Sequence, residues 1–420
     1  MIPAIWQKYL QKRGLPGDWR LEEEPGTTFE AAVVIPALAE SGSLFATLES
    51  LAAGPADDLA RTLVVVVVNN SPVATGEQRR DNQETLKRLR AGEAADGLKL
   101  TWVDAASAGQ ELPEKTAGAG LARKLGCDLS LTRLVHRQHT FIACLDADTL
   151  VEPGYLAALY RHFAAAGQGG AVLPFRHQQT QSSQASEAIE LYELYLRAYP
   201  LGLHLAGSPY AYHTVGSAMA CRADSYVRCG GMNKRKAGED FYFLQQLAKT
   251  CGVACLQGTT VHPSPRVSSR TPFGTGPSMS LLLAGEADAV NFYHPGAFAL
   301  LRDWLALVEE NIDAGGEELV HKGGEICLEM VSFLVDAGFA ESWDSIRSNS
   351  PGPAGRRRNF HDWFDALRTF RCVRHLDRRF PRMSPEQTVA SLLGELACSA
   401  EGDPQALNRF LLEQPGRFVP

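Results

Sequence analysis

The stretch FIACLDAD, residues 141–148, places two carboxylates, Asp146 and Asp148, directly after an unbroken run of apolar residues. Such a run predicts a buried strand in a sheet that is covered on both faces. Successive strand side chains point to opposite faces, so both carboxylates reach one ligand only if the chain turns after the strand. The segment TLVEPG at 149–154 permits that turn. Paired carboxylate oxygens predict a site for Mg²⁺ or Mn²⁺, and the alternative is a pair of solvated charges at a capped turn.

The pattern around this stretch predicts an α/β fold. From about residue 30 short apolar runs alternate with helical stretches, which is typical of βαβ units around a mainly parallel sheet. The expected strands are 31–35, 63–68, 98–103, 141–145, 171–174, 214–221 and 253–261. The expected helices are 43–53, 78–91, 117–134, 186–199, 223–229 and 240–251. Ligands of open parallel sheets bind beyond the carboxyl ends of the strands, so the segments that follow the strands are expected to line one site.

The rest of the chain is expected to be mostly helical. The segment 262–278 is rich in Pro, Ser, Gly and Arg, which predicts an irregular loop. Helices are expected at 295–310, 317–337 and 385–397, with a break at 348–358. The predicted organisation is an N-terminal helical extension (1–28), an α/β domain (29–280) and a helical C-terminal region (281–420).

The composition is that of a globular protein. Of the 420 residues 45% are hydrophobic, and the formal net charge is −7. This acidic balance argues against a general nucleic-acid-binding protein, whose surface would be strongly basic. The nine cysteines are scattered, and Cys251 and Cys255 lack a second pair at zinc-finger spacing, which predicts reduced thiols in a cytoplasmic protein. No segment has the apolar length expected of a signal peptide or a membrane span.

Two basic segments have two interpretations each. Lys8, Lys12 and Arg13 adjoin an apolar helical face near the N-terminus, and the segment 356–379 interleaves arginines with Phe and Trp. The N-terminal helix could lie on a membrane surface, and the segment 356–379 could bind an anionic acceptor or lipid head groups, so peripheral membrane contact is one interpretation. The favoured interpretation is that both are amphipathic helices packed on their neighbours.

Three segments within residues 30–265 follow one another in the order in which similar motifs occur in a known protein family. VVIPA at 33–37 is followed by Glu40, CLDADTLVEPGYL at 144–156 contains the paired carboxylates, and VGSAMACRADSYVRCGGMNKRKAGEDFYF at 215–243 contains Glu239 and Asp240. Together they resemble the inverting family 2 glycosyltransferases of the GT-A fold. The resemblance implies a mainly parallel sheet flanked by helices, and transfer of a single sugar from a nucleotide-diphosphate sugar donor to a hydroxyl acceptor.

The resemblance also implies roles for the acidic residues. Asp148 would be the main metal ligand and Asp146 would face the ribose or the metal, which offsets charge on the departing nucleoside diphosphate. Asp240 would be the general base that takes the proton of the acceptor hydroxyl, and Glu239 would orient the acceptor or a neighbouring side chain. A helix N-terminus attracts acidic residues without any ligand, which is the alternative for both.

The segments at the nucleotide side depart in part from the family pattern. Pro36 and Glu40 match the opening turn, and Leu38-Ala39 stands where Tyr-Asn is usual. Asn69 and Asn70 stand in place of the Asp-Asp pair that follows the second strand of the family. Asn keeps a donor and an acceptor but no charge. One of the two is expected near the nucleotide base, or both form a turn without a ligand.

Basic residues and one histidine complete the expected site. KTAGAGLARKLG at 115–126 resembles the family's Asn-x-Gly-x-x-x-Ala-Arg-Asn-x-Gly segment, a helix near the nucleotide, and makes Lys115 and Arg123 the basic candidates. Arg266 and Arg270, in the expected loop, would close over the diphosphate and exclude water, and the alternative is that this loop is a disordered linker. His262 is either a third metal ligand or a hydrogen-bonded histidine without a metal.

Two other classes of function remain as alternatives. A sugar nucleotidyltransferase has a related fold but needs a Gly-rich, Arg-containing loop after the first strand, and the segment 36–43 is not such a loop. A non-catalytic binding or scaffold protein could keep the fold, but it has no use for a metal-binding pair of carboxylates together with a base. The sequence therefore favours a metal-dependent glycosyltransferase.

Overall fold

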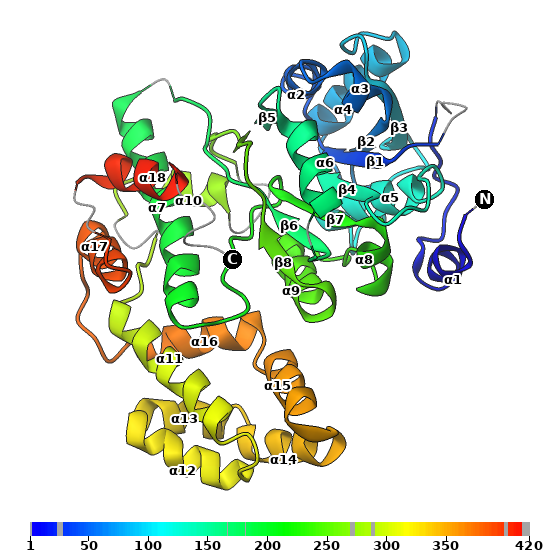
Figure 1. The fold of residues 1–420 in the computed structure, drawn as a ribbon. Coiled ribbons are helices and arrows are strands. Elements are labelled where there is room, and N and C mark those ends of the chain that lie inside the picture. The colour runs from blue at the N-terminus through cyan, green and yellow to red at the C-terminus, as the bar shows by residue number, and fades with distance from the viewer. Residues whose placement is uncertain are drawn as a thin grey trace. The chain divides into compact units, whose positions relative to one another are not determined.

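The computed structural model describes residues 2–22, 28–165, 167–180, 182–268, 274–286, 290–398 and 402–413. The chain divides into two compact units (Figure 1). Unit 1 comprises Met1–Ser182 and Thr214–Leu281, and unit 2 comprises Ser183–His213 and Leu282–Pro420. The segment 183–213, which the sequence pattern places within the α/β domain, thus belongs to unit 2.

Unit 1 is built around a seven-stranded sheet with the order β3-β2-β1-β4-β7-β6-β8. The strands are β1 (Ala31–Ala37), β2 (Thr62–Asn69), β3 (Lys99–Ala105), β4 (Phe141–Cys144), β6 (Gly170–Val172), β7 (Met219–Arg222) and β8 (Val253–Cys255). Strands β1 to β4 are parallel to one another, β7 is antiparallel to both β4 and β6, and β8 is parallel to β6. The mainly parallel sheet expected from the sequence is confirmed.

A two-stranded ribbon stands beside this sheet. It pairs β5 (Leu150–Val151) with β9 (Val261–His262) in antiparallel register, with Leu150 opposite His262. The single strand expected at 253–261 is therefore two short strands, β8 and β9. Gly258 lies between them with a φ of 88°, a left-handed conformation that an extended strand does not contain.

Helices cover both faces of the main sheet. Gly126 of α5 lies above β1 and β2, because a Cβ atom at this position would come within 2.4 Å of Val34 and 2.9 Å of Val67. On the opposite face, Phe141 of β4 stacks on Phe163 of α6 with ring centroids 5.1 Å apart. Every residue of β2 is buried, as expected for a strand covered on both sides.

The helices of unit 1 follow the expected order. They are α1 (Ala4–Arg13), α2 (Leu44–Ala52), α3 (Ala56–Ala60), α4 (Gly76–Arg90), α5 (Ala119–Ser130), α6 (Tyr155–Ala165), α8 (Ala223–Arg228) and α9 (Glu239–Cys251). A further helix, α10 (Thr275–Leu283), begins in unit 1. Its first residues, 275–278, had been expected to belong to the irregular loop 262–278. His262 at the start of that expected loop belongs to β9.

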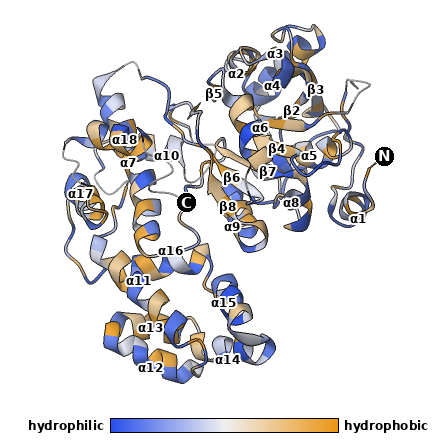
Figure 2. Cartoon of the chain, viewed as in Figure 1, coloured by the Kyte–Doolittle hydropathy of each residue, from blue (hydrophilic) through white to orange (hydrophobic). Residues whose placement is uncertain are grey.

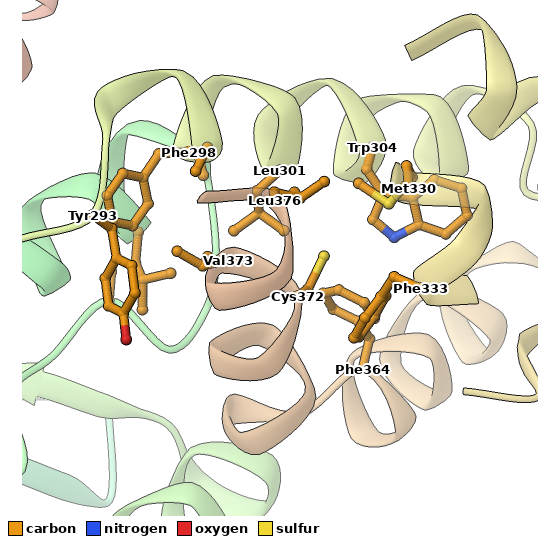
Figure 3. Close-up of a cluster of buried hydrophobic side chains, with 14 of the residues drawn as sticks. Tyr293, Phe298, Leu301, Trp304, Met330, Phe333, Phe364, Cys372, Val373 and Leu376 are labelled. Atoms are coloured by element: carbon orange, nitrogen blue, oxygen red, sulfur yellow. The ribbon is translucent and has the colours of Figure 1, made fainter. Parts of the chain in front are cut away.

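Unit 2 is a bundle of helices, each with hydrophobic and hydrophilic residues (Figure 2). They are α7 (Ser183–Leu205), α11 (Pro295–Glu310), α12 (Gly316–Ile326), α13 (Leu328–Asp336), α14 (Phe339–Asn349), α15 (Gly352–Trp363), α16 (Ala366–Asp377), α17 (Pro385–Glu395) and α18 (Pro404–Glu413). Trp304, Phe333 and Phe364 lie in its buried core (Figure 3). The helical C-terminal region expected from the sequence is confirmed.

Two boundaries in unit 2 differ from the prediction. The helix expected at 317–337 is interrupted at Cys327, whose extended backbone (φ −170°, ψ 160°) separates α12 from α13. The break expected at 348–358 is shorter, since α15 starts at Gly352 with Pro353 in its first turn, where a missing N–H costs nothing. Two arginines of the basic segment pair with acids of unit 2, Arg357 with Glu309 and Arg379 with Glu329.

Two further expectations concern the whole chain. Within the described ranges, none of the helices combines the length and the apolar character needed to cross a membrane. All nine cysteines are unpaired thiols. The odd number and scattered placement of the cysteines had predicted this.

Candidate active site

Acidic residues from three segments gather at one edge of the sheet. Glu40 follows β1, and Asp146 and Asp148 follow β4, the parallel neighbour of β1. Parallel neighbours end at the same edge, which is where ligands of such sheets bind. Glu239 and Asp240 open α9, and Glu239 is joined to Asp146 at this edge through a shared partner.

That shared partner is Arg123 of α5. Its Nη2 donates to Oδ1 of Asp146, and its Nη1 donates to Oε1 of Glu239. The side chain of Arg123 is only 3% exposed. Burial opposes the charge, but the two carboxylates outweigh burial and raise the pKa of Arg123 above its ordinary value. Arg123 is therefore a permanent cation that joins the Asp-x-Asp segment to the start of α9.

Two glycines make room for this contact. A Cβ atom at Gly216 would lie 2.8 Å from Nη2 of Arg123. The segment that leads into β7 therefore passes this close to the guanidinium because residue 216 is a glycine. A Cβ atom at Gly120 would lie 2.4 Å from the carbonyl oxygen of Arg235 and 2.8 Å from Cβ of Glu239. The glycines of the sequence segments at 118–120 and 215–217 thus allow close packing around Arg123.

A second arginine, Arg266, binds two of the other three acidic residues, Glu40 and Asp148. Its Nη2 contacts Oε1 of Glu40 and lies 2.9 Å from Oδ2 of Asp148. Ser43 donates from Oγ to the other oxygen of Glu40, whose side chain is buried. Arg266 thus lies at the carboxylates of Glu40 and Asp148. Arg270, its expected companion, lies outside the described residues.

Negative charge exceeds positive charge in this cluster, and the pKa values reflect it. Burial raises the pKa of Asp148 to about 7, and neighbouring Asp146 adds to the shift while Arg266 opposes it. Burial also raises the pKa of Asp240 to about 7, with Glu239 adding to the shift and Arg123 opposing it. Five carboxyl groups share two guanidiniums here, so the cluster favours an additional cation.

The carboxylates of Asp146 and Asp148 suit a divalent cation whose other ligands come from a bound molecule. Among the residues that the structure describes, no three Asp, Glu, His or Cys side chains are grouped as metal ligands. Asp146 and Asp148 supply two carboxylates, and Mg²⁺ is commonly held by one or two carboxylates together with substrate phosphates and water. The residues therefore suit a cation that binds together with a phosphorylated ligand.

His262 lies close to Asp148 in the backbone, but its ring has other partners. Gln178 donates from Nε2 to the carbonyl oxygens of both Asp148 and His262, each at 2.8 Å. In the ring of His262, Nδ1 lies 2.9 Å from the carbonyl oxygen of Arg176. Its Nε2 lies 3.6 Å from Oε1 of Glu152. A hydrogen-bonded ring of this kind needs to reorient before it can ligate a metal.

Asp240 lies in the first turn of α9, after the left-handed Gly238. Its Oδ1 accepts the backbone N–H of Phe241 at 2.7 Å. Glu239 is buried and held by Arg123, whereas Asp240 keeps partial access to solvent. A partly accessible carboxylate with a pKa near 7 has the properties of a general base at neutral pH.

The two asparagines after β2 have different environments. Asn69 donates from Nδ2 to the carbonyl oxygens of Ala37 (3.2 Å) and Val67 (3.1 Å), which holds neighbouring strands together. Asn70 is 2% exposed, yet neither Nδ2 nor Oδ1 has a partner among the described residues. A buried amide without partners costs about 1–3 kcal/mol. Asn70 therefore offers an unused donor and acceptor at the end of β2.

The other expected residues lie at the same end of the sheet without direct contact to the acids. Pro36 is in β1, opposite Val67 of β2, and is partly exposed. Lys115 is exposed in the turn that precedes α5. Sequence reasoning did not foresee that Arg123 and Arg266 would each bridge two carboxylates, because no local pattern marks a contact between distant segments.

Comparison with known proteins gives structural likenesses only. No model of a known protein family matches the chain, and no curated protein matches it. S. aureus TarS 1-349 in complex with UDP-GlcNAc is 12% identical with a TM-score of 0.39, over 84% of this chain and 93% of that chain. The mannosyltransferase PcManGT from Pyrobaculum calidifontis, in complex with GDP-Man and Mn²⁺, is 14% identical with a TM-score of 0.39, over 99% of this chain and 90% of that chain. Glucosyl-3-phosphoglycerate synthase from Mycobacterium tuberculosis, in complex with UDP, is 12% identical with a TM-score of 0.35, over 62% of this chain and 80% of that chain.

Proposed function

We propose that this chain is a metal-dependent glycosyltransferase that moves a single sugar from a nucleotide-diphosphate sugar to an acceptor hydroxyl with inversion. One observation carries the proposal: buried Arg123 binds both Asp146 and Glu239. It brings the Asp-x-Asp carboxylates and the acidic start of α9 into one cluster. The carboxylates that would anchor the donor diphosphate through a metal and the carboxylate that would act as base thus belong to the same cluster.

Asp146 and Asp148 would hold Mg²⁺ or Mn²⁺, which offsets the charge on the departing nucleoside diphosphate when it is bound. Asp148 would be the stronger ligand, because Arg123 already neutralises Asp146. Asp148 shares Arg266 with Glu40, so part of its charge is uncompensated. The raised pKa of Asp148 supports this assignment. It shows that burial and neighbouring negative charge disfavour the ionised carboxylate, and a bound cation would stabilise that form.

Asp240 would take the proton of the acceptor hydroxyl. Oδ1 is engaged by the N–H of Phe241, so the proton would go to Oδ2. As the O–H bond breaks, the acceptor oxygen bonds to the anomeric carbon, and the bond from that carbon to the diphosphate oxygen breaks with its electron pair on the diphosphate. A single displacement of this kind inverts the anomeric centre.

The remaining residues would position these groups. Glu239 and Arg123 would fix the start of α9, and with it the direction of Asp240. Arg266 would turn from the carboxylates to the phosphates of the donor and exclude water. Asn70 would hydrogen-bond the nucleotide base with its unused donor and acceptor.

The test is a thermal-shift screen of UDP, GDP, CDP and dTDP sugars with and without Mn²⁺, followed by an assay of slow donor hydrolysis. The proposal predicts a metal-dependent increase in melting temperature with one nucleotide and release of the nucleoside diphosphate. Release of pyrophosphate from a nucleoside triphosphate would instead identify a sugar nucleotidyltransferase. Binding without any turnover would identify a scaffold that keeps the fold.

A further inference from the structure

Unit 1 contains a cavity of about 530 Å³ that is separate from the acidic cluster. It is bordered by the end of α1, by α5, by α9 and by the loop 230–235. None of the five carboxyl groups of the candidate active site lines it. The two sites share α5, where Arg123 faces the acids and the next residue, Lys124, faces the cavity.

The charged side chains that line this cavity are all basic. They are Lys12, Arg13, Lys124, Lys234 and Arg235. Lys124 is neutralised by Asp128, with Nζ 2.8 Å from Oδ2. Within the described part of the chain the other four lie in no salt bridge. In a chain with a net charge of −7, four uncompensated cations around one cavity form a local field that attracts anions.

The basic wall formed by α1 is held firmly in place. Trp6 donates from Nε1 to Asp224 at 2.7 Å, and Tyr9 donates to buried Asp128 at 2.8 Å. A Cβ atom at Gly231 would lie 1.8 Å from the hydroxyl of Tyr9, so α1 docks against a backbone that only glycine permits. The end of α1, which carries the exposed Lys12 and Arg13, is therefore held at the cavity.

A further cation lines the cavity from the loop 230–235. The guanidinium of Arg235 lies over the ring of Tyr242 of α9, with Cζ 3.7 Å from the ring centroid. Stacking of this kind restricts the guanidinium while its N–H edge stays available for an anion. Basic groups from α1 and from the loop thus converge on one space from two sides.

We propose that this cavity binds a phosphate-bearing anion. Guanidinium and ammonium groups with no competing carboxylate are the typical partners of phosphate oxygens. The volume is within the range of about 300–1,000 Å³ of small-molecule sites. The phosphate group is the shared chemistry of a soluble phosphorylated ligand and of an anionic lipid head group. The inference stands independently of the proposed transferase activity, because it uses none of the acidic residues.

The direct test is calorimetric titration of the full chain with inorganic tripolyphosphate in EDTA, which removes any metal-dependent binding at the carboxylates. The expected result is saturable binding of one anion, weakened at least about tenfold in the double variant Lys12→Ala/Arg13→Ala. Arg235→Ala should weaken binding in the same direction. Absence of saturable binding to the wild-type chain would overturn the proposal.

A matched control is the double variant Lys99→Ala/Arg161→Ala. Both residues are exposed cations of unit 1 that do not line the cavity, so the control removes the same charge. It should bind tripolyphosphate within about twofold of the wild-type chain, since distant exposed charges are screened by salt. Equal loss in both double variants would mean general charge attraction and no site. Retained melting temperatures would show that the variants are folded.

Cosedimentation with vesicles distinguishes the two sources of phosphate. Binding to vesicles that contain phosphatidylglycerol but not to pure phosphatidylcholine, lost in Lys12→Ala/Arg13→Ala, would assign the site to lipid head groups. Binding of tripolyphosphate without any vesicle binding would assign it to a soluble phosphorylated ligand. Both results support a phosphate site. Vesicle binding that survives in the double variant, without tripolyphosphate binding, would contradict it.

Discussion

Nη2 of Arg266 lies 2.9 Å from Oδ2 of Asp148. The same guanidinium contacts Glu40, so a cation of the protein itself already lies at the carboxylate proposed to bind metal. A divalent cation that binds Asp148 must share or displace this contact. Arg266 and metal therefore compete for one oxygen ligand.

Replacement of Arg266 tests that competition. Arg266→Gln should tighten binding of Mn²⁺ in the absence of nucleotide, because Asp148 and Glu40 lose their cationic partner. The same change should slow donor turnover if Arg266 moves to the phosphates. Mn²⁺ titration followed by electron paramagnetic resonance measures the first effect. Arg161→Gln, an exposed charge on α6, is the control, and an unchanged or weaker Mn²⁺ affinity in Arg266→Gln would rule the competition out.

Removal of the paired carboxylates tests the metal site. Asp148→Ala should abolish metal-dependent binding of the nucleoside diphosphate, and Asp146→Ala should weaken it less. Since the pKa of Asp148 is raised to about 7, its proton competes with the metal below that pH. The metal affinity should then fall about tenfold per pH unit below pH 7. Nucleotide binding in EDTA equal to that in Mn²⁺ would contradict the assignment.

Asp240→Asn separates a base from a helix-terminal charge. Asp240 lies in the first turn of α9 and accepts the N–H of Phe241, and Asn keeps an acceptor oxygen but loses the charge, so a structural role predicts nearly unchanged turnover and at most about 1 kcal/mol of lost stability. A general base predicts unchanged donor affinity and a decrease in turnover of roughly 10²–10⁴. Turnover rates, donor affinity and melting temperature of this one variant decide between the two.

The pH dependence of stability adds an independent readout for Asp240. Its pKa is raised in the fold, so ionisation of the carboxyl group lowers stability as the pH rises through about 7. Asn carries no charge, so above pH 7 the melting temperature of Asp240→Asn should equal or exceed that of the wild-type chain. The turnover of the wild-type chain should fall below pH 7, as the base becomes protonated. A rate that is independent of pH between 6 and 8, at saturating metal, would argue against this base.

Asn70 and Asn69 form a natural pair for a test of the base-binding assignment. Asn70→Leu removes an amide with no partner, so stability should be unchanged or higher, while nucleotide affinity falls at least about tenfold. Asn69→Leu removes two hydrogen bonds within the sheet and should lower stability by about 1–2 kcal/mol. Thermal melts with and without nucleotide measure both effects. Loss of stability in Asn70→Leu with full nucleotide affinity would show that this amide is structural.

The sheet could be predicted from sequence because its signal is local. Unbroken apolar runs such as that of β2 identify buried strands wherever they occur, and the helix limits were mostly right within a few residues. The interruption at Cys327 and the onset of α15 at Gly352 were missed. Both depend on backbone conformation at single residues, which hydrophobic pattern does not report.

The acidic residues of the site could be predicted, but their partners could not. Asp146, Asp148 and Asp240 occur in motifs whose order along the chain is itself a signal. The contacts of Arg123 with Asp146 and Glu239 join segments far apart in sequence, and they depend on how α5 packs. The basic cavity was missed for the same reason, since its cations come from three separate segments.

The packing of Gly126 against Val34 and Val67 has a consequence for the active site. Gly126 is one helical turn after Arg123, so the spacing of α5 from the sheet also sets the height of the guanidinium above the strand ends. A methyl group at residue 126 would lift the helix without touching a charged atom. If the chain has the proposed activity, a natural variant at this buried position would lose activity although every residue of the candidate active site is unchanged.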